Sequence, residues 1–229
     1  MNLLQTIDIF PVILTLAVFR IGQWCQNKWK HPIFNPTLIG MILVLAFLLI
    51  TGMEPKIYTE GMKRMSWLMT PATICLAIPM YEQFRVLKKS LKAIIAGVAA
   101  GALSCLLVIL AAGLLLRFDR SILVSLLPKS VTTAIGVSLS ELFGGMGGVT
   151  TAAIIVTGIG GNMIGTVLCK LFHINDDVAQ GVAFGTSAHV IGTAKANELS
   201  QLTGAASSLS LVVAGLLTAI FMPLIVTIL

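Results

Sequence analysis

Lys129 is the residue of this chain whose position most clearly predicts a binding site. It follows Pro128 and precedes hydroxyl side chains at Ser130, Thr132 and Thr133. A proline-led helix start has free backbone N–H groups and a positive dipole end that attract anions, and Lys129 adds a full positive charge there. The pattern predicts a carboxylate or phosphate site made by these residues. The alternative is that Lys129 lies at the membrane interface and extends its ammonium group to lipid headgroups.

A histidine lies in a second polar stretch, inside an otherwise apolar segment. His189 is surrounded in sequence by Thr186, Ser187 and Thr193. An ionisable side chain within a membrane span is costly, and by default it faces the bundle interior with a partner. We therefore expect His189, Ser187 and Thr193 to contact a solute, and titration of the imidazole to couple transport to protons. The alternative is a structural histidine whose hydrogen bonds are satisfied within the bundle.

Prolines predict a broken helix in a third polar stretch. Pro71 and Pro79 each remove a backbone donor and disfavour helical geometry in the residue before them. Broken backbone at membrane depth persists only where protein buries it or where it lines a watery cavity. Thr70 and Thr73 are therefore candidate cavity residues. The alternative is a kinked helix that its neighbours pack against.

Two asparagines complete the set of candidate contacts. Asn35 precedes Pro36 at another proline-led helix start, and Asn162 follows Gly161 in a glycine-rich stretch. Gly161 and Gly165 are four residues apart, a spacing that predicts close helix packing. Asn162 is the side chain of that stretch that could reach a solute.

The composition predicts an all-α polytopic membrane protein. Of 229 residues, 57% are hydrophobic and 10% are charged, whereas a soluble domain has about 25% charged residues. We expect one integral membrane domain over residues 1–229, with interrupted helices. Apolar runs close to the ~20 residues that cross a bilayer predict about eight spans, at 8–25, 34–52, 62–83, 92–117, 121–143, 148–172, 178–199 and 205–229.

The charges lie mainly in the connecting loops. The net charge of +6 therefore indicates membrane orientation and lipid contact, and argues against nucleic-acid binding. The two most basic loops, 26–32 and 82–92, are expected on the cytoplasmic side, with both termini outside. Lys56, Lys170 and several other basic residues fall in or beside the opposite loops and weaken this assignment.

Interrupted segments in both halves predict an internal repeat, over 34–117 and 121–229. An inverted repeat requires an odd number of crossings between equivalent helices, and eight spans give an even number. Either 121–143 is re-entrant, or the repeat is parallel, or the count is off by one.

Enzyme chemistry is not expected. Ser187 and His189 are two residues apart and point to different faces of a helix, which argues against a hydrolase. Neither the scattered histidines nor the scattered cysteines have the spacing of a metal site. The cysteines are interpreted as small hydrophobic residues, and we expect no cofactor.

Several motifs together resemble the LrgB/CidB family over nearly the whole chain. They are Asn35-Pro36, Thr70-Pro71-Ala72-Thr73, Pro128-Lys129-Ser130-Val131-Thr132-Thr133, Thr157-Gly158-Ile159 and Gly185-Thr186-Ser187-Ala188-His189. The chain departs from the family pattern at Thr70, where a glycine is usual, and at Ala134, where a proline is common.

The resemblance implies two classes of function. The family is described as holin-like and antiholin-like regulators of murein hydrolase activity and cell lysis, acting with a small membrane subunit of the LrgA/CidA type. A plastid relative resembles a glycolate/glycerate translocator, and some bacterial members are similar to pyruvate carriers. A passive holin needs only apolar helices that oligomerise. The polar residues Lys129, His189 and Asn162 go beyond that requirement. We therefore expect a carrier of small monocarboxylates in the bacterial inner membrane, as a dimer, with the regulator as the alternative.

Overall fold

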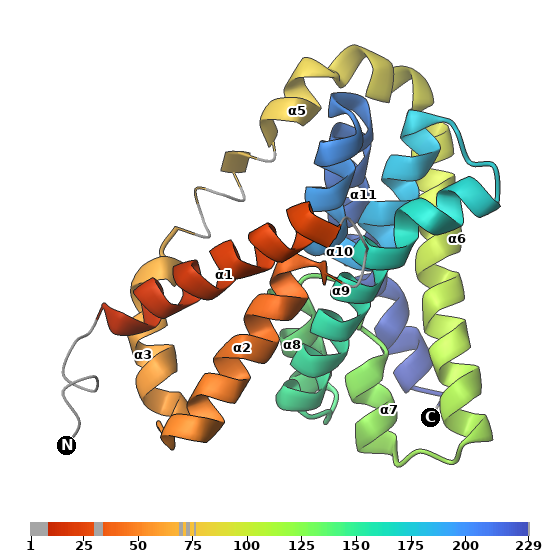
Figure 1. Ribbon diagram of the computed structural model, residues 1–229. Helices are drawn as coiled ribbons and strands as arrows, with labels where there is room; N and C mark the ends of the chain where they lie inside the picture. The colour runs from red at the N-terminus through yellow and green to blue at the C-terminus, as the bar shows by residue number, and fades with distance from the viewer. Residues whose placement is uncertain (1–8, 30–33, 69–70, 72–73, 76, 229) are drawn as a thin grey trace. The chain divides into compact units, whose positions relative to one another are not determined.

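The described residues form helices and no strands. The computed structural model describes residues 9–29, 34–68, 71, 74–75 and 77–228. They belong to two compact units that divide between residues 75 and 76 and are described separately (Figure 1).

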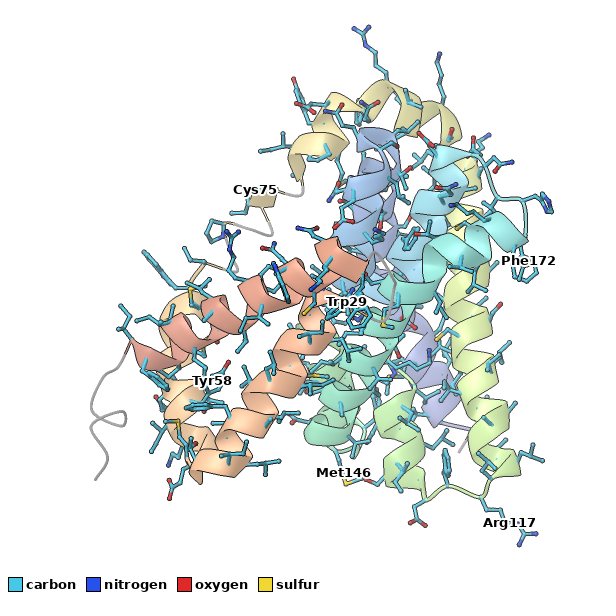
Figure 2. All side chains as sticks on the ribbon, viewed as in Figure 1. Trp29, Tyr58, Cys75, Arg117, Met146 and Phe172 are labelled. Carbon is cyan, nitrogen blue, oxygen red and sulfur yellow. The ribbon has the colours of Figure 1, made fainter. Side chains whose placement is uncertain are left out.

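The first unit contains α1 (Phe10–Trp29), α2 (Pro36–Thr51) and α3 (Pro55–Ser66). Helix α1 packs against α2 and α3, and the hydroxyls of Thr15 and Tyr58 lie 2.7 Å apart between α1 and α3 (Figure 2). The unit also contains Asn35, which caps α2: its Oδ1 accepts hydrogen bonds from the backbone N–H groups of Thr37 and Leu38 at 2.9 and 3.3 Å. This cap supplies partners for N–H groups that a helix start leaves free.

The second unit is built on long helices. Among the described residues, the three helices long and apolar enough to cross a membrane are α6 (Phe84–Leu115), α9 (Gly147–Leu171) and α11 (Gln201–Val226). Leu87 near the start of α6 packs in the same cluster as Leu202 near the start of α11, and Leu106 packs with Met222 near the end of α11. Helices α6 and α11 therefore run in the same direction. The unit's helices are α5 (Ala77–Glu82), α6 (Phe84–Leu115), α7 (Arg120–Leu126), α8 (Thr133–Leu142), α9 (Gly147–Leu171), α10 (Asp177–Leu199) and α11 (Gln201–Val226).

Helix α10 folds back on itself at His189. The backbone there is non-helical, with φ 43° and ψ −136°. Ser200 Oγ, just beyond the end of α10, donates a hydrogen bond of 2.8 Å to Asp177 Oδ2 at its start. In a straight helix these residues would be about 34 Å apart. Residues 177–199 are therefore a helical hairpin, called here the second hairpin, whose tip is His189.

Helices α7 and α8 form a similar hairpin. Ser125 Oγ in α7 accepts a hydrogen bond of 2.7 Å from the backbone N–H of Met146, which follows α8. A Cβ atom placed on Gly145 would contact both Ser125 Oγ and Ser140 Oγ, so α7 and the end of α8 lie side by side. Residues 120–142 are called the first hairpin, and its tip is 127–132.

The two hairpins enter the second unit from opposite ends. The first hairpin packs in the cluster that contains Met222 and Val226, at the end of α11. The second begins beside the start of α11, because Val178 packs against the cluster of Leu87 and Leu202. Figure 1 shows α7 and the C-terminus at the same end of the unit, and in Figure 2 Arg117 and Met146 mark that end while Phe172 lies away from it.

The hairpins correct two of the expected spans. Residues 121–143 and 178–199 do not cross as single helices, because Pro128 lies in one tip and the backbone breaks at His189 in the other. The re-entrant interpretation of 121–143 matches the observed geometry. Stretch 62–83 is not one helix either, since α3 ends at Ser66 and α5 begins at Ala77. The eight-span count is not confirmed, and the single domain and repeats 34–117 and 121–229 stay predictions.

Fold-back of α10 can be tested by joining its ends. In a variant whose native cysteines are replaced by serine, Asp177→Cys with Ser200→Cys should form a disulfide on mild oxidation, because their side chains are in hydrogen-bonding contact. Both thiols should then resist a maleimide–polyethylene glycol label until a reductant is added. The single variants serve as controls and should stay labelled. Full labelling of the oxidised double variant would contradict the hairpin.

Candidate functional site

The hairpin tips meet beside the middle of α6. Ser130 in the first tip lies 3.1 Å (Oγ to Sγ) from Cys105 of α6. One turn earlier in α6, a Cβ atom placed on Gly101 would lie 2.8 Å from Thr186 Cγ2, near the second tip. Both tips therefore contact one short stretch of α6, about halfway along its apolar part.

An open cavity of about 560 Å³ lies at this meeting point. Among the described residues that line it, Lys129 is the one charged residue, and the polar ones include Ser104, Ser130, Thr157, Thr186 and Ser187. The Lys129 ammonium is half-buried and donates a hydrogen bond of 3.3 Å to Ser130 Oγ. No aspartate or glutamate belongs to the described lining. The cavity thus presents one cation with no acidic residue in its wall.

The start of α8 adds to this positive potential. Thr132 is the N-cap of α8, and its side chain makes no capping hydrogen bond. The first N–H groups of a helix and its dipole favour negative charge. Because Lys129 precedes this helix start by a few residues, both features favour an anion near the same tip.

Thr186 supplies an unpaired hydroxyl near the cavity. Its side chain is buried, with 6% exposed, and its Oγ1 has no hydrogen-bond partner among the described residues. A buried hydroxyl without a partner costs about 1–3 kcal/mol. Thr186, Ser130 and Cys105 also line a water-sized void of about 10 Å³. A water molecule or a polar group of a bound solute would satisfy this hydroxyl.

His189 is hydrogen-bonded to α9. Its Nε2 lies 2.9 Å from the backbone oxygen of Ile154, so Nε2 carries the proton and donates. The side chain is buried, and a Cβ atom on Gly158 would lie 2.6 Å from its Cε1. Such a bond is what the alternative for His189 predicts, namely a structural histidine whose hydrogen bonds are satisfied within the bundle. Lys129 is also close enough to interact electrostatically with His189.

Thr193 and Asn162 hold the broken backbone beside His189. Thr193 Oγ1 donates to the His189 backbone oxygen at 2.9 Å and lies 2.9 Å from Ser207 Oγ in α11. Asn162 Nδ2 donates to the Ile191 backbone oxygen at 3.1 Å. Both side chains satisfy groups of the second tip or link it to a neighbouring helix.

The other candidate residues lie in different places. Ser187 lines the cavity, and its Oγ donates to the Ala183 backbone oxygen at 2.6 Å. Thr133 is exposed at the start of α8. Asn35 caps α2 in the first unit, and Thr70 and Thr73 lie outside the described residues.

Sequence reasoning missed the position of Cys105 and the packing role of Gly158. The sequence indicates only a small hydrophobic residue at Cys105, yet it lines the cavity and contacts Ser130. Nothing in its apolar surroundings distinguishes it in the sequence. The predicted packing role of Gly161 and Gly165 is confirmed, since Cβ atoms there would clash with Ala188 and Phe184 of the second hairpin. Gly158 extends this face of α9 by one turn.

Close packing of α9 against the second tip can be tested at Gly158. Gly158→Ala should lower stability by about 1–3 kcal/mol, because the added methyl would lie 2.6 Å from His189 Cε1. Gly160→Ala is the matched control: a Cβ there meets nothing within 4 Å, so the helix preference for alanine should leave stability unchanged or raised. Thermal unfolding in detergent measures both. Equal melting temperatures would contradict the packing.

Comparison with known proteins gives a family for this chain. Residues 15–228 match the LrgB-like family. The chain is 28% identical over 218 residues to a protein named Holin-like protein CidB in Staphylococcus epidermidis, with 95% of each chain covered. It is 36% identical over 214 residues to the protein named Uncharacterized protein YwbG of Bacillus subtilis, covering 93% of this chain and 94% of the relative. No solved structure matches the chain. Because the family match covers nearly all of the chain, this protein belongs to the LrgB-like family.

Proposed function

We propose that this protein carries small monocarboxylates, such as glycolate, glycerate, lactate or pyruvate, across the membrane. The observation that supports this is the half-buried Lys129 ammonium in a cavity whose described wall has no acidic residue. A buried charge is stabilised when an opposite charge pairs with it. A carboxylate of the solute would supply that charge, and the free N–H groups at the start of α8 would add to its binding.

The hairpins suggest how a solute could reach the site from both sides. The first hairpin enters at the end of α11 and the second at its start, and each is followed by a long apolar helix. In place of the expected repeats 34–117 and 121–229, we propose that 120–171 and 177–226 are an inverted repeat, as in transporters whose interrupted helices meet near the bilayer midplane. Movement of one tip would open the cavity to one side, and movement of the other tip to the opposite side.

Basic residues suggest the orientation of the second unit. Arg85, Lys88, Lys89 and Lys92 lie near the start of α6, and Lys170 lies near the end of α9, which the fold-back of the first hairpin places at that same end. Arg117 and Arg120 lie at the other end. The positive-inside rule then assigns the start of α6 to the cytoplasm and the end of α11 to the outside of a bacterial inner membrane.

A second candidate is a holin-like regulator of murein hydrolase activity. The name Holin-like protein CidB, carried by a relative that the chain matches over 95% of its length, favours it. A regulator of this kind would act together with a small LrgA/CidA-type subunit. Passive, non-saturable leakage of solutes would accompany its activity. A carrier instead shows saturable uptake of a defined solute class.

Uptake into proteoliposomes separates the two candidates. With labelled glycolate, lactate and pyruvate, and with or without the small subunit, we expect saturable uptake that Lys129→Ala reduces at least tenfold. Loss of a charged hydrogen bond of about 1.5–3 kcal/mol gives a change of that size. Lys170→Ala, outside the cavity lining, should retain wild-type uptake.

Three other outcomes count against the carrier. They are no uptake under an imposed pH gradient with or without the subunit, uptake that does not saturate, and leakage of a trapped fluorescent dye in proportion to the amount of protein. Any of them would favour the holin-like candidate.

Proton coupling through His189 is a separate prediction. His189→Gln keeps a side-chain donor near the Ile154 carbonyl oxygen but removes the titratable group. If His189 couples transport to protons, the variant should still take up solute while losing the stimulation by an inward proton gradient. Unchanged stimulation would exclude coupling through this residue.

A further inference from the structure

The second unit has another large cavity, an apolar groove whose lining residues differ from those of the Lys129 site. It has a volume of about 400 Å³ and is formed by α5, the start of α6 and Leu209 of α11. Tyr81 and Phe84 are exposed to 84% and 59%. Lys88 is the one charged residue among the described residues that line it. The groove therefore combines an apolar wall with a single cation.

Lys88 belongs to a cluster of basic side chains on α6, made with Arg85, Lys89 and Lys92. Arg85 and Lys92 lie three residues before and four residues after Lys88, so all three side chains are neighbours on the helix surface. In the described part of the chain none of the cluster forms an ion pair. Glu82 is the one acidic residue between 77 and 92, so the cluster keeps a net positive charge.

The length of α6 places this cluster at the depth of lipid headgroups. The helix has 32 residues, and a span needs about 20. Residues 94–115 carry no charge and are long enough to cross the hydrocarbon core, whereas all four basic residues precede them. The start of α6 therefore extends into the interfacial region, where exposed aromatic side chains such as Tyr81 and Phe84 are favoured.

We propose that this groove is a binding site for an anionic phospholipid. The acyl chain lies along the apolar wall made by Met80, Phe84, Leu87 and Leu91, and Lys88 with Arg85 and Lys92 binds the phosphate. Charge complementarity selects an anionic lipid over a zwitterionic one, because anionic headgroups attract basic residues at a membrane surface. A bound lipid would fix α5 against α6 and α11 at this end of the unit.

The test uses the purified full chain in a neutral detergent. Thermal unfolding is measured with added phosphatidylglycerol and, separately, with phosphatidylcholine that has the same acyl chains. We expect phosphatidylglycerol to raise the melting temperature in a saturable way and phosphatidylcholine to have a clearly smaller effect. Lys88→Ala combined with Arg85→Ala should increase the phosphatidylglycerol concentration needed for half the shift at least fivefold.

Two control variants separate the groove from general surface charge. Arg117→Ala with Arg120→Ala removes the same charge from the opposite end and should leave the phosphatidylglycerol effect unchanged. Ala77→Trp places a large ring in the groove while keeping all basic residues, and it should weaken the effect as Lys88→Ala with Arg85→Ala does. The proposal is wrong if both lipids act equally, if neither has an effect, or if the two arginine substitutions act as strongly as Lys88→Ala with Arg85→Ala. Because no solute transport is measured, the result is independent of the carrier proposal.

Discussion

The second unit depends on satisfying the broken backbone of α10 at His189. The bilayer core contains no water that could hydrogen-bond to exposed backbone groups. The backbone groups freed by an interrupted helix must therefore find partners inside the protein. Here the partners are specific: Thr193 Oγ1 donates to the His189 oxygen and Asn162 Nδ2 to the Ile191 oxygen. The His189 ring donates in turn to the Ile154 oxygen of α9. These bonds fix the second tip against α9 and α11, and so fix one wall of the cavity.

Glycines make this arrangement possible by allowing close approach. On α9 they admit the His189 ring and the Ala188 and Phe184 side chains. On α10, Gly181 and Gly185 allow the backbone of Thr203 and Ser207 in α11 to approach closely. The spacing of Gly161 and Gly165 predicts a packing face on α9, but the sequence does not indicate Gly158 as part of it or the second hairpin as its partner. The polar character of the stretch around His189 was also visible. That polarity predicts solute contact, whereas Thr193 and Asn162 hydrogen-bond to the backbone of the tip itself.

The all-helical fold and the long apolar helices could be predicted from the sequence, whereas the role of Lys129 stays a prediction. Helices α2, α6, α9 and α11 occupy stretches expected to span. The fold-back of α10 could not be predicted, because no proline or glycine stands at position 189. In addition, the stretch 178–199 is long enough to cross the membrane as one helix. The bond from Ser200 to Asp177 that reveals it joins residues far apart in sequence. Similarly, the contact between Cys105 and Ser130 depends on how the first hairpin meets α6, and no local pattern encodes it.

Carriage of a solute requires that the two tips enclose one site at Lys129 that opens to either side of the membrane. Cys105 lines that cavity and carries a free thiol, so its reactivity reports whether the cavity opens and what occupies it. In a variant that keeps Cys105 alone of the four cysteines, a membrane-impermeant thiol reagent is applied to each face of oriented vesicles. We expect modification from both faces, slowed by glycolate or pyruvate, with that protection lost in Lys129→Ala. Modification from neither face, or at a rate that no carboxylate changes, would contradict such a site.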